Sequence, residues 1–182
     1  VSEEKGLYKF KIKIGGEEFS SYITKDGKIL FPQGIDLEKA PKNEENPKAK
    51  KKSETLAGFL ISEEEVCKEE GKPIVYFFGA EWCPHCSWEH PIVKEVIKEF
   101  KGYISFHDNM GSENERDVFL KYSDGGIPTV IIGCRYFRVG SGEGLGKEKE
   151  AESLKALICK LTKGQPADVC DKVQNLIEQI NG

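Results

Sequence analysis

A chain of 182 residues has room for one ordinary domain and a small appendage. Its hydrophobic fraction of 38% is sufficient for a core, and its net charge of −4, spread over residues of both signs, excludes the basic surface of a nucleic-acid-binding protein. No apolar run is long enough to predict a membrane span.

Residues 1–37 predict a small β-meander module. In its first strand apolar residues alternate with lysines, and the apolar ones are Tyr8, Phe10, Ile12 and Ile14. Gly15-Gly16 and Asp26-Gly27 are hairpin turn signals, so we expect antiparallel strands at about 7–14, 17–24 and 28–31. Because so small a meander cannot bury both of its faces, it is expected to pack on the main domain, on a partner or on a second copy of itself.

Residues 38–54 predict a charged linker, because Pro41, Pro47 and a run of lysine, glutamate and asparagine leave little to bury. The lysines of this segment are interpreted as part of a solvated tether rather than as a binding patch. Residues 55–182 then form the main domain.

In the main domain, predicted strands and helices alternate, which indicates the α/β class. A short strand is expected at 55–59, and the capping box of Ser62 and Glu65 predicts a helix from 62 to about 70. The continuously apolar run at 74–78 is typical of a central strand covered on both faces. The later elements are a helix at 83–101, a strand at 103–107, a helix at 114–122, strands at 130–132 and 136–139, and helices at 147–161 and 167–180.

A CxxC motif follows the apolar run at the start of the next predicted helix. Cys83 and Cys86 stand three positions apart there, so their thiols can close a small, reversible disulfide. The partial positive charge of a helix N-terminus favours the thiolate of the first cysteine. Cys83 is therefore the predicted attacking sulfur and Cys86 the resolving one. The flanking Trp82 and Pro84 predict an exposed turn, which argues against a purely structural disulfide.

Three landmarks in order resemble the thioredoxin family over residues 55–162. The first is the active-site stretch Phe78-Gly79-Ala80-Glu81-Trp82-Cys83-Pro84-His85-Cys86, the second is Pro91, and the third is the cis-proline loop Gly126-Ile127-Pro128-Thr129-Val130. The resemblance implies a thioredoxin fold, a central mixed sheet flanked by helices, here with the N-terminal meander and an extra C-terminal helix. It also implies that Pro128 is cis and that the backbone of Ile127 pairs with a bound peptide as an added strand.

Two finer likenesses bear on the type of oxidoreductase. Pro84-His85 resembles the pair in DsbA-type oxidants, where such a histidine would stabilise the Cys83 thiolate and make the disulfide more oxidising; the alternative is an exposed spacer. Residues 6–31 are similar to the dimerisation module of DsbC-type isomerases, which implies a homodimer. A strand-rich extension without a dimerisation function is the alternative.

The family usually carries a buried acid six residues before the first cysteine, and here that position is Phe77. Proton transfer to or from Cys86 must then use another group. Glu81 is the nearest candidate relay, and an exposed charge without a catalytic role is the other interpretation of it.

The four remaining cysteines permit three pairings. We favour a structural Cys159–Cys170 bridge, because a turn at Gly164-Gln165-Pro166 would fold the two C-terminal helices back on each other. Cys67 and Cys134 are expected away from the active site, either bridged or as free buried thiols. Further disulfides would indicate an extracytoplasmic compartment or the cytosol of a hyperthermophile.

The predicted function is a thiol–disulfide oxidoreductase acting on protein substrates, as an oxidant or an isomerase, with a partner that recycles the Cys83–Cys86 pair. No cofactor is expected. His90, His107 and Asp108 raise the question of a metal, but one CxxC supplies two ligands whereas structural zinc takes four, so no metal site is predicted. A metal-binding chaperone module and a non-catalytic protein-interaction scaffold are the alternatives.

Overall fold

The computed structural model describes residues 2–4, 6–14, 17–31 and 53–181. The chain divides into two compact units, Val1–Ala49 and Lys50–Gly182. Nearly all of the predicted linker, and the Gly15-Gly16 turn, lie outside the described residues.

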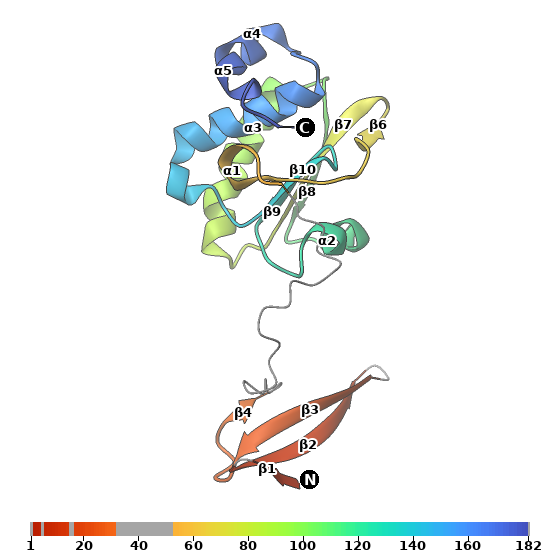
Figure 1. Cartoon of the computed structure of the whole chain (residues 1–182), viewed down its shortest axis with the longest axis vertical. Helices are drawn as coiled ribbons and strands as arrows, with labels where there is room; N and C mark the ends of the chain where they lie inside the picture. Colours follow the sequence, from red (N-terminus) through yellow and green to blue (C-terminus); the bar gives the residue numbers. More distant parts are fainter. Residues whose placement is uncertain (1, 5, 15–16, 32–52, 182) are drawn as a thin grey trace. The chain divides into compact units, whose positions relative to one another are not determined.

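The N-terminal unit is an antiparallel sheet with the strand order β1-β2-β3-β4 (Figure 1). Its strands are β1 (Ser2–Glu4), β2 (Leu7–Ile14), β3 (Glu17–Thr24) and β4 (Leu30–Phe31). The three predicted strands are thus present, and β1 is an additional strand that sequence analysis missed. At the second turn Gly27 has a φ of +70°, and its N–H donates to the carbonyl of Thr24 at 2.9 Å. That left-handed conformation is the reason for a glycine there.

The larger unit is built on a mixed sheet with the path β5-β10-β9-β7-β6, and β8 pairs in parallel with β7. Its strands are β5 (Leu60–Ile61), β6 (Lys68–Glu69), β7 (Lys72–Gly79), β8 (Ser105–Met110), β9 (Thr129–Ile132) and β10 (Tyr136–Val139). The central strand β7 covers the predicted run at 74–78 and is buried along almost its whole length.

Helices cover both faces of this sheet (Figure 1). They are α1 (Pro84–Glu99), α2 (Arg116–Tyr122), α3 (Lys147–Leu161), α4 (Ala167–Cys170) and α5 (Gln174–Ile177). Side chains alternate along β7, so Phe77 enters the core formed with α1 and α3, whereas Phe78 enters the core next to α2. This is the α/β architecture expected from the sequence. Among the described helices none is both long and apolar enough to cross a membrane.

Two elements predicted at the start of the main domain, at 55–59 and 62–70, were wrong. In place of a strand at 55–59 there is a 3-10 turn at Leu56–Gly58, and in place of a helix at 62–70 there is a loop and the short strand β6. Ser62 accepts a hydrogen bond from the N–H of Glu64, not of Glu65, and the N–H of Cys67 donates to the carbonyl of Gly133. Pairing with the sheet and the Cys67–Cys134 disulfide outweigh the marginal stability of so short a helix.

The single helix predicted at 167–180 was also wrong. The segment is α4, a 3-10 turn at Asp171–Val173, and α5. Val169, Val173 and Ile180 are buried in the main core, so the segment bends to bring apolar residues from separate turns onto α3.

All six cysteines are paired, as Cys67–Cys134, Cys83–Cys86 and Cys159–Cys170. The sequence favoured the Cys159–Cys170 pairing and left Cys67 and Cys134 open. The compartment inferred from such bridges stays a prediction.

Removing either disulfide remote from the CxxC should destabilise the fold, and the Cys67–Cys134 bridge should matter more. It joins residues 67 positions apart, whereas Cys159–Cys170 spans 11. In the chain-entropy model these separations correspond to about 4 and about 3 kcal/mol. Urea unfolding of the paired variants Cys67→Ala/Cys134→Ala and Cys159→Ala/Cys170→Ala measures both losses. A larger loss for the shorter loop would contradict the expectation.

Candidate redox site at the start of helix α1

The chain turns from β7 into α1 through Cys83, which is the N-cap residue of the helix. Its N–H donates to the carbonyl of Ala80 at 3.1 Å, and its Sγ accepts from the N–H of Cys86 at 3.2 Å. Pro84 occupies the first helical position, where its lack of an N–H costs nothing and its fixed φ suits the helix. The sulfur of Cys83 therefore accepts from a backbone N–H that has no partner within the helix.

The two cysteines of the Cys83–Cys86 disulfide differ slightly in exposure. Cys83 retains 5% of its surface and Cys86 none, whereas the neighbouring Trp82 is 81% exposed. Cys83 is thus slightly more accessible than Cys86, and the order of attacking and resolving cysteines stays a prediction.

The loop before β9 lies at the same end of the sheet as the CxxC, because Thr129 pairs with Phe78 near the end of β7. The Ile127–Pro128 peptide bond is cis. The hydroxyls of Ser123 and Thr129 both donate to the carbonyl of Gly126, which holds the loop in place. Gly126 is needed there, since a Cβ atom would come within 2.6 Å of Val139.

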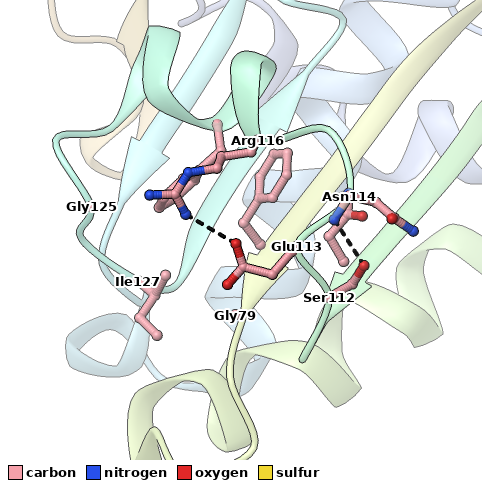
Figure 2. A pocket seen from close by; sticks show the side chains of 10 residues that line it. Gly79, Ser112, Glu113, Asn114, Arg116, Gly125 and Ile127 are labelled. Carbon is pink, nitrogen blue, oxygen red and sulfur yellow. Dashed lines mark hydrogen bonds and ion pairs between the residues drawn. The ribbon is translucent and has the colours of Figure 1, made fainter. Parts of the chain in front are cut away.

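A cavity of about 150 Å³ lies next to this loop (Figure 2). Phe78, Phe119 and Ile127 contribute apolar lining, and the end of β8 and the loop that follows contribute polar residues. Among these, Arg116 forms an ion pair with Glu113 at 3.1 Å. The cavity therefore offers mixed apolar and polar chemistry beside the residue expected to pair with a bound peptide.

His85 has a carboxylate partner that the sequence did not reveal. Its Nδ1 lies 2.8 Å from Oε2 of Glu143, in the turn before α3. Both side chains are at least half exposed, so the pair contributes little to stability. Its effect is to hold the imidazole at the CxxC.

Sequence analysis also missed a buried cluster formed by Glu89, Arg138 and Glu150. The guanidinium of Arg138 donates to Oε1 of Glu89 at 2.8 Å and to both oxygens of Glu150 at 2.7 and 3.0 Å. Both glutamates are fully buried. The three residues come from α1, β10 and α3, so only the tertiary fold brings them together.

This cluster holds the turn that carries Glu143. The N–H of Gly142 donates to Oε2 of Glu89 at 2.8 Å. A Cβ atom on Gly142 would overlap the carboxylate of Glu150, so the close approach requires glycine. The buried cluster thereby positions Glu143 toward His85.

One proton remains in the buried cluster at neutral pH. Burial, and next the negative charge of Glu150, raise the pKa of Glu89 to about 8, although Arg138 opposes the shift. Two buried carboxylates facing one guanidinium carry an uncompensated negative charge, and a proton on Glu89 removes it.

The free energy of unfolding should therefore fall as the pH rises from about 4.5 to about 8. In this range the unfolded chain has lost the proton of Glu89 while the folded chain keeps it, so the slope is on the order of 1 kcal/mol per pH unit. Glu89→Gln mimics the protonated acid and should lose this part of the slope in urea unfolding measured across the range. The exposed Glu95→Gln is the control, and equal slopes for all three proteins would refute the assignment.

Glu81, the predicted relay, is exposed and its side chain lies beside Gly111. Phe77, at the position of the family's acid, is fully buried. Among the described residues no cluster of three or more His, Cys, Asp or Glu side chains is arranged to hold a metal ion.

Residues 60–161, more than half of the chain, match the family model described as Thioredoxin. The chain belongs to the thioredoxin family. This confirms the fold class expected from the sequence, whereas the DsbA and DsbC likenesses stay predictions.

Curated relatives are thioredoxins of modest similarity. Thioredoxin M4, chloroplastic, of Arabidopsis thaliana is 33% identical over 64 residues, which cover 35% of this chain and 33% of that protein. Thioredoxins of Pseudomonas aeruginosa and Rickettsia bellii are each 33% identical over 70 residues, which cover 38% of this chain and 63% and 65% of those proteins. The chain thus spans between a third and two thirds of the length of these relatives.

Proposed function

We propose that this protein is a thiol–disulfide oxidoreductase that exchanges disulfides with protein substrates through Cys83 and Cys86. The observation that carries the proposal is the disulfide at the N-terminus of α1, with the Sγ of Cys83 accepting the backbone N–H of Cys86 at 3.2 Å. A thiolate at that position gains the same hydrogen bond and the favourable helix dipole, so it is a better nucleophile at neutral pH than a free cysteine.

In the reducing direction, the Cys83 thiolate attacks a client disulfide and releases one client thiolate, which takes up a proton. Cys86 then loses its proton and attacks the Sγ of Cys83. The Cys83–Cys86 bond forms, the bond between Cys83 and the client breaks, and the second client thiolate leaves and is protonated. Two electrons pass to the client, and the reverse sequence oxidises it.

Substrate binding is proposed at the cis-proline loop. The backbone of Ile127 would pair with an extended client segment, which main-chain hydrogen bonds hold irrespective of sequence. The exposed Trp82 flanks the same sulfur and offers apolar contact area.

We further propose that the pair acts as an oxidant or isomerase rather than as a reductant. Support comes from Pro84-His85, which resembles the pair in DsbA-type oxidants, and from the contact between His85 and Glu143, which holds the imidazole at the CxxC. Stabilising the thiolate stabilises the reduced form and makes the disulfide more oxidising. The relatives named thioredoxin favour the reductant as the second candidate.

Cys83→Ser should abolish both the oxidation of reduced ribonuclease and the reduction of insulin, whereas Cys86→Ser should accumulate a mixed disulfide with the client. The first variant lacks the sulfur that attacks the client, and the second lacks the sulfur that resolves the mixed disulfide. Activity assays and mass spectrometry of the trapped adduct measure these outcomes. Undiminished turnover by Cys83→Ser would overturn the proposal.

The reduction potential of the same couple separates the two candidates. Equilibration with a glutathione buffer should give a value near −120 mV for an oxidant and near −270 mV for a reductant. A value at the second figure would remove the oxidant assignment while leaving disulfide exchange intact.

The N-terminal unit is proposed as a homodimerisation module. Three apolar side chains of its described strands and turn are at least 39% exposed, namely Tyr8, Ile29 and Phe31. A small four-stranded sheet gains stability when a second copy covers such residues.

Sedimentation of the full chain should then give twice its 20.4 kDa mass. Phe31→Asp should shift the equilibrium to the monomer, because it places a charge among the apolar residues to be covered, and the exposed Lys28→Gln serves as the control. A monomer at all concentrations would remove the dimer and the isomerase argument that depends on it.

A further inference from the structure

The mechanism proposed above requires a group that takes the proton of the resolving thiol. Only a thiolate attacks a disulfide at a useful rate, so Cys86 must be deprotonated before it resolves the mixed disulfide. Cys86 is fully buried, the position of the family's acid is occupied by Phe77, and Glu81 is exposed. A different acceptor must therefore lie near the inner side of the CxxC.

The ring of Phe77 lies close both to Cys86 and to a histidine. A Cβ atom built on Gly79 would be 2.7 Å from Cε1 of Phe77 and 3.2 Å from Cβ of Cys86, so Phe77 reaches the immediate surroundings of this cysteine. The same ring packs on the imidazole of His90, with 4.8 Å between their centroids. His90 follows Cys86 by four residues on α1, a spacing that places two side chains on one helix face with Cβ atoms about 5–6 Å apart.

His90 is oriented by a carboxylate from the sheet. Its Nε2 lies 2.9 Å from both oxygens of Asp108 on β8. Asp108 is the register partner of Phe77 on the neighbouring strand, so its side chain lies on the face of the sheet that α1 covers. Because an ionised carboxylate only accepts hydrogen bonds, Nε2 carries the hydrogen, and Nδ1 of the neutral ring keeps a free lone pair.

The exposure of this pair suits a proton relay. The side chain of His90 is 17% exposed and that of Asp108 is 32% exposed, whereas Cys86 has no exposed surface. The His90–Asp108 pair thus reaches the solvent, whereas Cys86 does not.

Other ionisable groups in this part of the described structure are less suitable. The two oxygens of Glu89 already accept from Arg138 and from Gly142. His107 is the register partner of Tyr76, whose ring it contacts, and so lies on the opposite face of the sheet, where Glu69 and Glu115 hold it.

We propose that His90, oriented by Asp108, is the proton acceptor of Cys86, directly or through one water molecule. The inference depends on the proposed function. The S–H proton of Cys86 moves to Nδ1 of His90, and the thiolate attacks Sγ of Cys83. The Cys83–client bond breaks, and the client thiolate leaves with the electron pair. In the reverse direction the imidazolium returns the proton to Cys86 as the Cys83–Cys86 bond opens.

One reaction with two kinetic phases measures the reactivity of Cys83 and that of Cys86 separately. The full chain, reduced at Cys83–Cys86, is mixed with the aromatic disulfide dithiobis(nitrobenzoate), whose released thiolate is coloured. The first phase reports the attack of Cys83 and the second reports the attack of Cys86 on the resulting mixed disulfide. Both rates are measured as a function of pH in the wild type and in each variant.

His90→Gln keeps a donor toward Asp108 but cannot take up a proton. It should slow the second phase by about 100-fold at neutral pH, leave the first phase unchanged, and approach the wild-type rate in alkali, where hydroxide deprotonates Cys86. Asp108→Asn should also slow the second phase, because the amide no longer fixes the tautomer of His90. This variant provides the test if His90→Gln does not fold. Glu81→Gln and His107→Gln are the matched controls and should behave as the wild type.

An unchanged pH profile of the second phase in folded His90→Gln would overturn the inference, as would equal slowing of both phases or an equal effect of Glu81→Gln. These results leave the proposed function intact. A wild type that shows no second phase would instead overturn the proposed function, and this inference with it.

Discussion

The backbone N–H of Cys86 directed at the sulfur of Cys83 is the contact on which the proposed chemistry depends. It exists because the buried strand β7 ends at Gly79 and the N-cap residue of α1, Cys83, follows four residues later, with a sulfur in place of the usual capping oxygen. The sheet fixes the position of the helix start, and the helix start fixes the electrostatic environment of the sulfur. A change in either would alter the stability of the thiolate before it altered any contact with a client.

Two buried carboxylates and one exposed carboxylate lie near the redox pair. The buried group, Glu89 and Glu150 on either side of Arg138, holds the turn at Gly142 and through it the Glu143 that contacts His85. Burying such charged groups costs desolvation free energy, and this cost is offset only where every charge is paired and hydrogen-bonded. Here the cluster joins α1, β10 and α3 through hydrogen bonds to one guanidinium.

A second arrangement places histidine–carboxylate pairs around the site. His85 is held by Glu143 on the exposed side of the CxxC, and His90 is held by Asp108 on the inner side. The exposed pair can act on the charge of the Cys83 thiolate, and the inner pair can act on the proton of Cys86. The two cysteines thus have separate electrostatic environments, as attacking and resolving sulfurs require, although the family's buried acid is replaced by Phe77.

The sequence alone determined the parts of this protein that depend on neighbours in the chain. The sequence predicted the apolar strand β7, the CxxC with Pro84 at a helix start, the proline loop at Ile127-Pro128, and the helices α1 and α3. It could do so because a strand, a cap or an amphipathic helix is specified by residues close together in the chain. Only the tertiary structure decided that residues 62–70 form a loop and a strand, that Cys67 meets Cys134, and that the C-terminal segment bends. It alone also brought Arg138 between two glutamates and Asp108 to His90. The physical reason is that burial, ion pairing and strand pairing join residues far apart in the chain, and these interactions outweigh the local preferences from which a sequence is interpreted.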